Sequence, residues 1–174
     1  TNLDEILAVS DGIMVARGDL GVEVPFEELP SIQKTIIHKC RIQGKRSITA
    51  TEMLESMIKN PRPTRAEISD VANAVYDGSS AIMLSGETAA GEHPVEAVKA
   101  MARIAAQAEE NTQYINYIKP EDYHIKTLSE ALSHSACTLA QDIGAKLIVA
   151  CTRSGYTAKL VSRFRPMIDI IGMT

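Results

Sequence analysis

Three short apolar runs recur in the first half of the chain, and each one ends in a cluster of polar residues. They are Ile13–Ala16, Ser47–Ala50 and Ala81–Leu84. A short apolar run closed by glycine or polar residues is typical of a buried strand that meets a loop. The runs start about 34 residues apart, which is the length of a strand plus a crossover helix. The pattern predicts parallel strands whose polar ends share one edge, as at the mouth of a (β/α) barrel.

Helical periodicity fills the intervals between these strands. A helix is expected near residues 27–43, and Thr64 and Glu67 have the spacing of a capping box that opens the next one. Pro94 opens a long helix to about Thr112. The inner faces expected for the last two helices are Ile68, Val71, Ala72 and Val75, and Val95, Val98, Met101 and Ala105.

The helical pattern stops near residue 112, and the chain divides there. We expect residues 1–115 to form a first domain, 116–124 a linker and 125–174 a second domain. In the second domain, Thr127 and Glu130 form another predicted capping box. Its helix is expected to pack Leu128, Leu132, Leu139 and Ile143, and strands follow at Leu147–Cys151 and from Ile168.

Neither predicted sheet is complete. Three βα units cannot close a barrel, and two parallel strands leave most faces and edges of an α/β sheet uncovered. An open three-stranded sheet is conceivable as a minimal fold, but strands that are apolar on both faces need cover. Because the sequence also begins without methionine, we expect it to be part of a longer chain.

Composition excludes several classes of function. A net charge of −4 gives no basic field for nucleic acid or an anionic membrane. No apolar run reaches the roughly 18 residues that a transmembrane helix needs. The three cysteines have neither metal-ligand spacing nor a disulfide pattern, which fits a reducing, cytoplasmic location.

The polar cluster after the first strand is Arg17-Gly18-Asp19. A carboxylate at a strand end suits Mg²⁺, which prefers oxygen ligands and binds one or two carboxylates together with substrate oxygens. The glycine lets backbone N–H groups approach an anion, and the guanidinium adds charge. The alternative is a loop salt bridge between Arg17 and Asp19.

The clusters after the second and third strands are Thr51-Glu52 and Ser85-Gly86-Glu87-Thr88. Their hydroxyls can donate hydrogen bonds to a phosphoryl group or pass a proton through water. Alternatively, Thr51 caps a helix that begins at Glu52. Capping would explain any single cluster, but the coincidence of three clusters favours a site.

A further polar loop, Thr152-Arg153-Ser154-Gly155-Tyr156-Thr157, lies between a predicted strand and a helix. Its amides, hydroxyls and arginine could hold an anion at the start of the helix. An ordinary capping turn explains the same residues equally well.

Several long motifs, in this order, resemble the pyruvate kinase family. The resemblance spans nearly the whole chain and is weakest at 112–127. The motifs are residues 10–21 (SDGIMVARGDLG), 49–57 (TATEMLESM), 61–67 (PRPTRAE), 70–75 (DVANAV), 83–89 (MLSGETA) and 152–166.

The resemblance implies an α/β fold made of the last three βα units of a (β/α)₈ TIM-type barrel, followed by the first half of a C-terminal α/β domain with a parallel sheet. It implies phosphoryl transfer from phosphoenolpyruvate to ADP, giving pyruvate and ATP in glycolysis. It also implies Mg²⁺ or Mn²⁺, K⁺ held by residues outside this chain, and a homotetrameric parent.

The resemblance also assigns roles to individual residues. Asp19 matches a metal ligand. Arg17, Gly18, Asp19 and Thr51 match substrate-binding positions. Thr51 and Ser85 match catalytic positions, with Ser85 in a proton relay. Thr152, Arg153, Ser154, Gly155 and Thr157 correspond to an effector site for a sugar phosphate or nucleotide, with Arg153 where the family commonly has lysine and Thr157 where it commonly has serine.

The family's catalytic lysine and second metal carboxylate correspond to a segment before Thr1. We therefore expect residues 1–174 alone to be inactive, because phosphoryl transfer depends on positioning and charge neutralisation. The competing hypothesis is a non-catalytic phosphate-binding or interaction module on the same scaffold. The joint presence of Asp19, Thr51 and Ser85 favours the enzyme.

Overall fold

The computed structural model describes residues 2–111 and 125–174, which fall into two compact units. The first unit contains a three-stranded sheet and the second a two-stranded sheet, and both sheets are parallel. The predicted α/β class is confirmed. The predicted linker at 116–124 lies outside the described residues.

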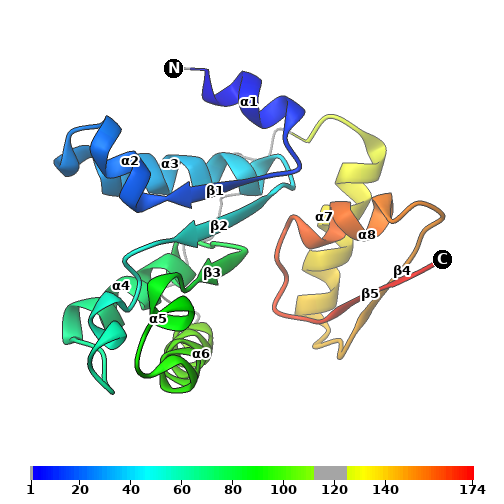
Figure 1. The fold of residues 1–174 in the computed structure, drawn as a ribbon. Helices are drawn as coiled ribbons and strands as arrows, with labels where there is room; N and C mark the ends of the chain where they lie inside the picture. The colour runs from blue at the N-terminus through cyan, green and yellow to red at the C-terminus, as the bar shows by residue number, and fades with distance from the viewer. Residues whose placement is uncertain (1, 112–124) are drawn as a thin grey trace. The chain divides into compact units, whose positions relative to one another are not determined.

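The first sheet has the order β1-β2-β3, with strands Gly12–Ala16, Arg46–Ala50 and Ala81–Met83. Figure 1 shows these three strands side by side. Ala50 is the register partner of both Ala16 and Met83. The strands therefore end at the same level, and the segments that follow them leave from one edge of the sheet.

Short and long helices precede, connect and follow the strands of the first unit. Their bounds are α1 Leu3–Val9, α2 Arg17–Glu23, the 3₁₀ helix η1 Phe26–Glu28, α3 Leu29–Ile42, the 3₁₀ helix η2 Glu55–Ile58, α4 Arg65–Tyr76, α5 Gly86–Ala89 and α6 Pro94–Glu110. The predicted capping box at the start of α4 is confirmed, because the Thr64 side chain accepts from the Glu67 N–H and the Glu67 side chain accepts from the Thr64 N–H.

Two apolar clusters stabilise the first unit. One joins the β2–α4 connection to α4 and α6, and it buries Met53, Leu54, Met57, Val71, Ala74, Ala97, Ala100 and Met101. The other lies between α1, β1 and α3 and buries Leu7, Val15, Ile36 and Cys40.

The inner faces predicted for α4 and α6 are partly wrong. Ile68, Val95 and Val98 are all more than 40% exposed. The buried positions on these helices include Ala74, Ala97 and Ala100, whose small side chains let α4 and α6 pack closely. Of the branched residues predicted to face inward, Val71 is buried as expected, whereas Ile68, Val95 and Val98 are exposed.

In the second unit, β4 (Ile148–Cys151) and β5 (Ile170–Met173) are paired in parallel, α8 (Tyr156–Ser162) packs on them, and α7 (Leu128–Asp142) packs on α8. The predicted Thr127–Glu130 capping box is confirmed. The predicted packing of α7 is wrong, because the four predicted side chains, Leu128, Leu132 and Leu139 of the helix and Ile143 at its C-cap, are 60% to 76% exposed. The face that α7 buries carries Ser133, Cys137 and Ala140.

Within the described part of the chain, no helix combines the length and the apolar character needed to cross a membrane.

Candidate active site

The loops that follow β1 and β2 are joined directly at the shared edge of the sheet. Helix α2 begins at Arg17, immediately after β1, and the backbone N–H of Gly18 donates to Thr51 Oγ1 at 2.8 Å. Thr51 is the first residue after β2. Two of the polar clusters that the sequence placed at strand ends therefore lie in contact.

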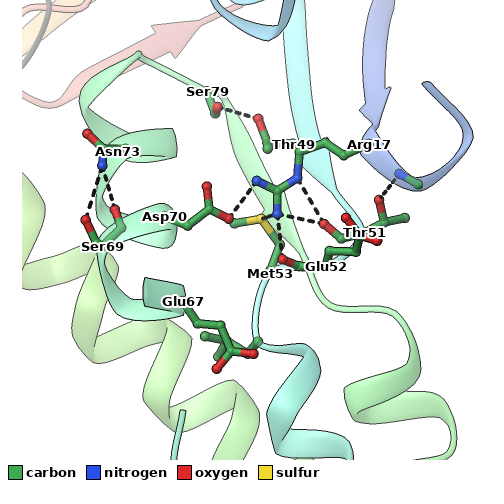
Figure 2. A network of polar contacts seen from close by, with 12 residues as sticks. Arg17, Thr49, Thr51, Glu52, Met53, Glu67, Ser69, Asp70, Asn73 and Ser79 are labelled. Atoms are coloured by element: carbon green, nitrogen blue, oxygen red, sulfur yellow. Dashed lines mark hydrogen bonds and ion pairs between the residues drawn. The ribbon is translucent and has the colours of Figure 1, made fainter. Parts of the chain in front are cut away.

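Arg17 connects these loops through its guanidinium group (Figure 2). The side chain is buried, with 8% of the residue exposed. Nε and Nη2 donate to the Thr51 carbonyl at 3.0 and 2.7 Å, and Nη2 also donates to the Glu52 carbonyl at 2.8 Å. Nη1 pairs with Asp70 Oδ2 of α4 at 2.6 Å. The sequence offered an Arg17–Asp19 salt bridge as the alternative. Arg17 pairs instead with the carboxylate of Asp70, which lies 53 positions away.

Thr51 and Glu52 adopt a left-handed backbone, with φ of 68° and 53°. This region costs a residue with a Cβ about 1–2 kcal/mol. The Arg17 guanidinium donates to both carbonyls of the pair and so stabilises the turn. The alternative that Thr51 caps a helix starting at Glu52 is wrong, since the next helix, η2, begins at Glu55 and the Thr51 hydroxyl accepts from Gly18 instead.

Glu87 connects the loops that follow β2 and β3. Its residue is 0% exposed. Oε1 accepts from the Leu54 N–H at 3.0 Å, and Oε2 accepts from the Ser85 N–H at 2.7 Å. The sequence placed Glu87 in the right cluster but gave no sign that it is buried or that it contacts Leu54. Ser85 is held by this bond at the start of α5.

Glu67 fixes η2 against the start of α4, the helix that carries Asp70. Its carboxylate accepts from the N–H and the hydroxyl of Ser56 at 2.7 and 2.6 Å and from the Thr64 N–H at 2.7 Å. Burial raises the pKa of Glu67, but the hydrogen bonds from Ser56 and Thr64 outweigh it and leave the pKa below its ordinary value. The carboxylate therefore stays ionised as an acceptor at neutral pH.

Asp19 lies in the first turn of α2, next to Gly18, and is exposed. Among the described residues its carboxylate makes no hydrogen bond or ion pair, and no group of three His, Cys, Asp or Glu residues there could enclose a metal ion. Mg²⁺ is usually bound by one or two carboxylates together with water and substrate oxygens. An exposed carboxylate beside the joined loops fits one such ligand.

The segment Thr152–Thr157 of the second unit runs from the end of β4 into the first turn of α8. The Thr157 N–H donates to Thr152 Oγ1 at 3.4 Å, and Gly155 adopts a left-handed conformation with φ of 80° directly before α8. Arg153 and Ser154 are exposed, and a Cβ at Gly155 would meet no atom within 4 Å. The candidate effector residues thus form one open turn.

The first unit has the features of a piece of an α/β barrel enzyme: parallel strands end at one level, and the polar segments beyond them are joined by buried charged side chains. The family model "Pyruvate kinase, barrel domain" matches residues 1–98, and the model "Pyruvate kinase, alpha/beta domain" matches residues 130–174. The chain belongs to the pyruvate kinase family.

Individual relatives agree with the family models. The chain is 52% identical over 174 residues to the pyruvate kinase of Clostridium acetobutylicum and 53% identical over 174 residues to that of Staphylococcus epidermidis, and each alignment covers 99% of the chain. A crystal structure of a pyruvate kinase from Cryptosporidium parvum superposes with a TM-score of 0.90 at 50% identity and covers 98% of the chain. The chain spans 37%, 30% and 35% of the lengths of these three proteins.

Proposed function

We propose that the full-length protein containing these residues transfers a phosphoryl group from phosphoenolpyruvate to ADP in glycolysis and releases pyruvate and ATP. The observation that carries this proposal is the joined edge of the first sheet, where the Gly18 N–H meets the Thr51 hydroxyl beside the exposed Asp19. Membership of the pyruvate kinase family supports the choice of reaction.

In this proposal Asp19 supplies one carboxylate to a bound Mg²⁺ or Mn²⁺ ion, which neutralises phosphoryl charge when it is present. The amides of Gly18 and Asp19 and the hydroxyl of Thr51 bind the substrate carboxylate. Because the Gly18 N–H donates to Thr51 Oγ1 here, substrate binding exchanges that bond for bonds to the ligand. Arg17 contributes indirectly, because its guanidinium donates to the Thr51 carbonyl and so holds Thr51 in place.

The chemistry divides into two steps. The bond between phosphorus and the enol oxygen breaks while ADP's terminal phosphate oxygen bonds to phosphorus. The enolate left behind then takes a proton at its methylene carbon and becomes pyruvate. We assign Ser85 to the relay of that proton, since its hydroxyl belongs to the third strand-end loop and a positioned hydroxyl can pass a proton through water.

We further propose that residues 1–174 alone are inactive. The family's catalytic lysine, its second metal carboxylate and its K⁺ ligands correspond to positions outside this chain. Asp19 then remains the sole assigned metal ligand, and little is left to neutralise the charge of the transferred group.

The experiment is a continuous assay of pyruvate formation from phosphoenolpyruvate and ADP by the full-length protein, with and without Mg²⁺. We expect turnover that requires the metal and K⁺, and no turnover by residues 1–174 alone. Metal-dependent turnover by residues 1–174 would contradict the proposed inactivity. Absence of turnover by the full-length protein would contradict the proposed enzyme.

The open turn at Thr152–Thr157 supports a second proposal, that the α/β unit binds the phosphate of a sugar-phosphate or nucleotide effector in a homotetrameric, cytoplasmic enzyme. Exposed Arg153 and Ser154 and the uncrowded Gly155 support it. The alternative is the non-catalytic phosphate-binding module. It would be favoured if the full-length protein showed no turnover but bound a phosphate ester, and if Arg153→Ala abolished that binding.

A further inference from the structure

Glu52 is the exposed residue of the turn that follows β2. Its backbone is left-handed, with φ of 53°, a conformation that is strained for any residue with a Cβ. Among the described residues its side chain makes no hydrogen bond or ion pair that would offset this strain. Strained residues cluster at binding and catalytic sites. The carboxylate of Glu52 is therefore a candidate for a role in ligand binding.

The turn holds the backbone of Glu52 at a fixed place beside Thr51 (Figure 2). Arg17 Nη2 donates to the carbonyls of both residues, at 2.7 Å for Thr51 and 2.8 Å for Glu52. The next residue, Met53, is 0% exposed, and its Sδ lies 3.1 Å from the same nitrogen. Consecutive Cα atoms are about 3.8 Å apart, so the Glu52 carboxylate stays within roughly 11 Å of the Thr51 hydroxyl, even when its side chain is fully extended.

In the described part of the chain, no cation is paired with this carboxylate. The guanidinium of Arg17 is already paired with Asp70, with 2.6 Å between Nη1 and Oδ2. Asp19, on the neighbouring loop, is exposed and is likewise without an ion pair among the described residues. Because the charges of Arg17 and Asp70 cancel, two uncompensated carboxylates lie near the N–H groups that we assign to the substrate.

The charge of Glu52 acts in opposite directions on the two ligands assigned to this edge. Phosphoenolpyruvate is an anion, which Glu52 repels, whereas a divalent cation is attracted. At about 10 Å in a medium close to water, one unit charge changes the dissociation constant of a singly charged ligand by about twofold, and that of a multiply charged ligand by more. We propose that Glu52 is a specificity-determining residue, which weakens binding of the anion, strengthens binding of the divalent cation and so favours occupation of the edge by the cation first.

This inference rests on the proposed phosphoryl transfer from phosphoenolpyruvate. Glu52 acts through its charge alone: it neither binds the metal ion nor touches the substrate. Its effect is therefore on the two affinities, and because electrostatic interactions add, its effect on the anion is the same with and without the bound cation.

The test is Glu52→Gln in the full-length protein, which removes the charge and keeps the shape of the side chain. Two dissociation constants are measured without ADP, so that no turnover occurs. Phosphoenolpyruvate is titrated by ³¹P NMR, in EDTA and again at saturating Mg²⁺, and Mn²⁺ alone is titrated by electron paramagnetic resonance. At low ionic strength we expect the dissociation constant of phosphoenolpyruvate to fall under both conditions and that of Mn²⁺ to rise, each by about twofold to tenfold. Both shifts should shrink at about 0.5 M salt, where the Debye length is only about 4–5 Å.

Three further variants separate the charge from other effects of the substitution. Glu5→Gln makes the same change at an exposed residue of α1, the helix that leads into the opposite end of β1, and should match the wild type. Glu52→Asp keeps the charge and should also match the wild type. Glu52→Lys changes the charge by two units, so each of its fold-changes should be about the square of that in Glu52→Gln.

Unchanged dissociation constants in Glu52→Gln, or shifts of the same sign for both ligands, overturn the proposal. A loss of Mn²⁺ affinity of about a hundredfold or more that persists in high salt would show that Glu52 ligates the ion, which also overturns it. If none of the Glu52 variants folds, the residue is a folding determinant and the proposal is wrong. Failure of the wild type to bind phosphoenolpyruvate even at saturating Mg²⁺ would instead refute the proposed function, so the two failures are distinguishable.

Discussion

Arg17→Lys is the substitution that tests the joined loops most sharply. Lysine keeps the charge, but its single nitrogen cannot reach the carbonyls of Thr51 and Glu52 and the carboxylate of Asp70 together. The guanidinium makes all of these contacts. The variant therefore keeps the positive charge but loses the hydrogen-bond geometry of the guanidinium.

The cost of the left-handed turn and the energy of the hydrogen bonds that lysine loses are similar in size. Two left-handed residues cost roughly 2–4 kcal/mol together, at about 1–2 kcal/mol each. A hydrogen bond to a charged group contributes about 1.5–3 kcal/mol. Lysine loses about two such bonds, and the Asp70 side chain is 36% exposed, so water recovers part of the loss. A net loss of about 3 kcal/mol is expected, which is enough to let the turn relax.

The assay is kcat/KM for phosphoenolpyruvate in the full-length protein. A loss of about 3 kcal/mol corresponds to roughly a hundredfold decrease if all of it appears as a smaller population of the competent turn. Arg103→Lys, at an exposed position of α6, is the control and should match the wild type. Glu52→Gly added to Arg17→Lys should recover about tenfold, since glycine does not pay the left-handed penalty. Wild-type kcat/KM in Arg17→Lys, or no rescue by Glu52→Gly, would refute the reasoning.

Further predictions concern stability of the first unit in the full-length protein. Gly91→Ala should lower the free energy of unfolding by about 1–3 kcal/mol, because its Cβ would lie 2.5 Å from a backbone oxygen. Gly21→Ala should raise the free energy of unfolding by about 0.5–1 kcal/mol, because Gly21 lies in helix α2 and its Cβ would meet no atom within 4 Å. Chemical denaturation measures both, and equal effects would contradict the packing argument. Glu67→Gln should cost about 1 kcal/mol at neutral pH, as for loss of a cap. The folded-state pKa of Glu67 lies below its ordinary value of 4.5, so its contribution is present above that pH and is lost as the pH falls through the folded-state pKa. The difference between wild type and Glu67→Gln should therefore narrow in acid, and a difference independent of pH would show that ionisation of Glu67 does not matter.

Local signals in the sequence predicted the elements well. Both capping boxes form as expected, because a serine or threonine and a glutamate three positions later interact within one turn. The shared edge of the first sheet was also predictable, since strands joined by crossover helices run parallel and their C-terminal ends lie at one edge.

Interactions between distant positions were not predictable. Arg17 is followed at once by a glycine and a nearby carboxylate, yet its partner is Asp70 in α4. The left-handed turn at Thr51 and Glu52 has no glycine to indicate it and depends on that same guanidinium. Such features arise from tertiary contacts, which override local preference.

Helix faces show a related limit. In α7 the periodicity of the leucines marks an apolar face correctly, but the helix uses another face against α8. The contact runs through Ser133, Cys137 and Ala140, whose size allows close approach. Periodicity identifies a face, whereas the neighbouring element decides whether that face is buried.

The most direct measurement is the rate of pyruvate formation by full-length Asp19→Asn, compared with Glu23→Gln. Both positions are exposed on α2, and both changes remove one negative charge. If the edge of β1, β2 and β3 holds the metal for phosphoryl transfer, Asp19→Asn should lower kcat/KM by about a hundredfold or more and raise the Mg²⁺ concentration needed for half-maximal rate, while Glu23→Gln keeps the wild-type rate. An unchanged rate and metal requirement in Asp19→Asn would contradict the assignment of the active site to this edge.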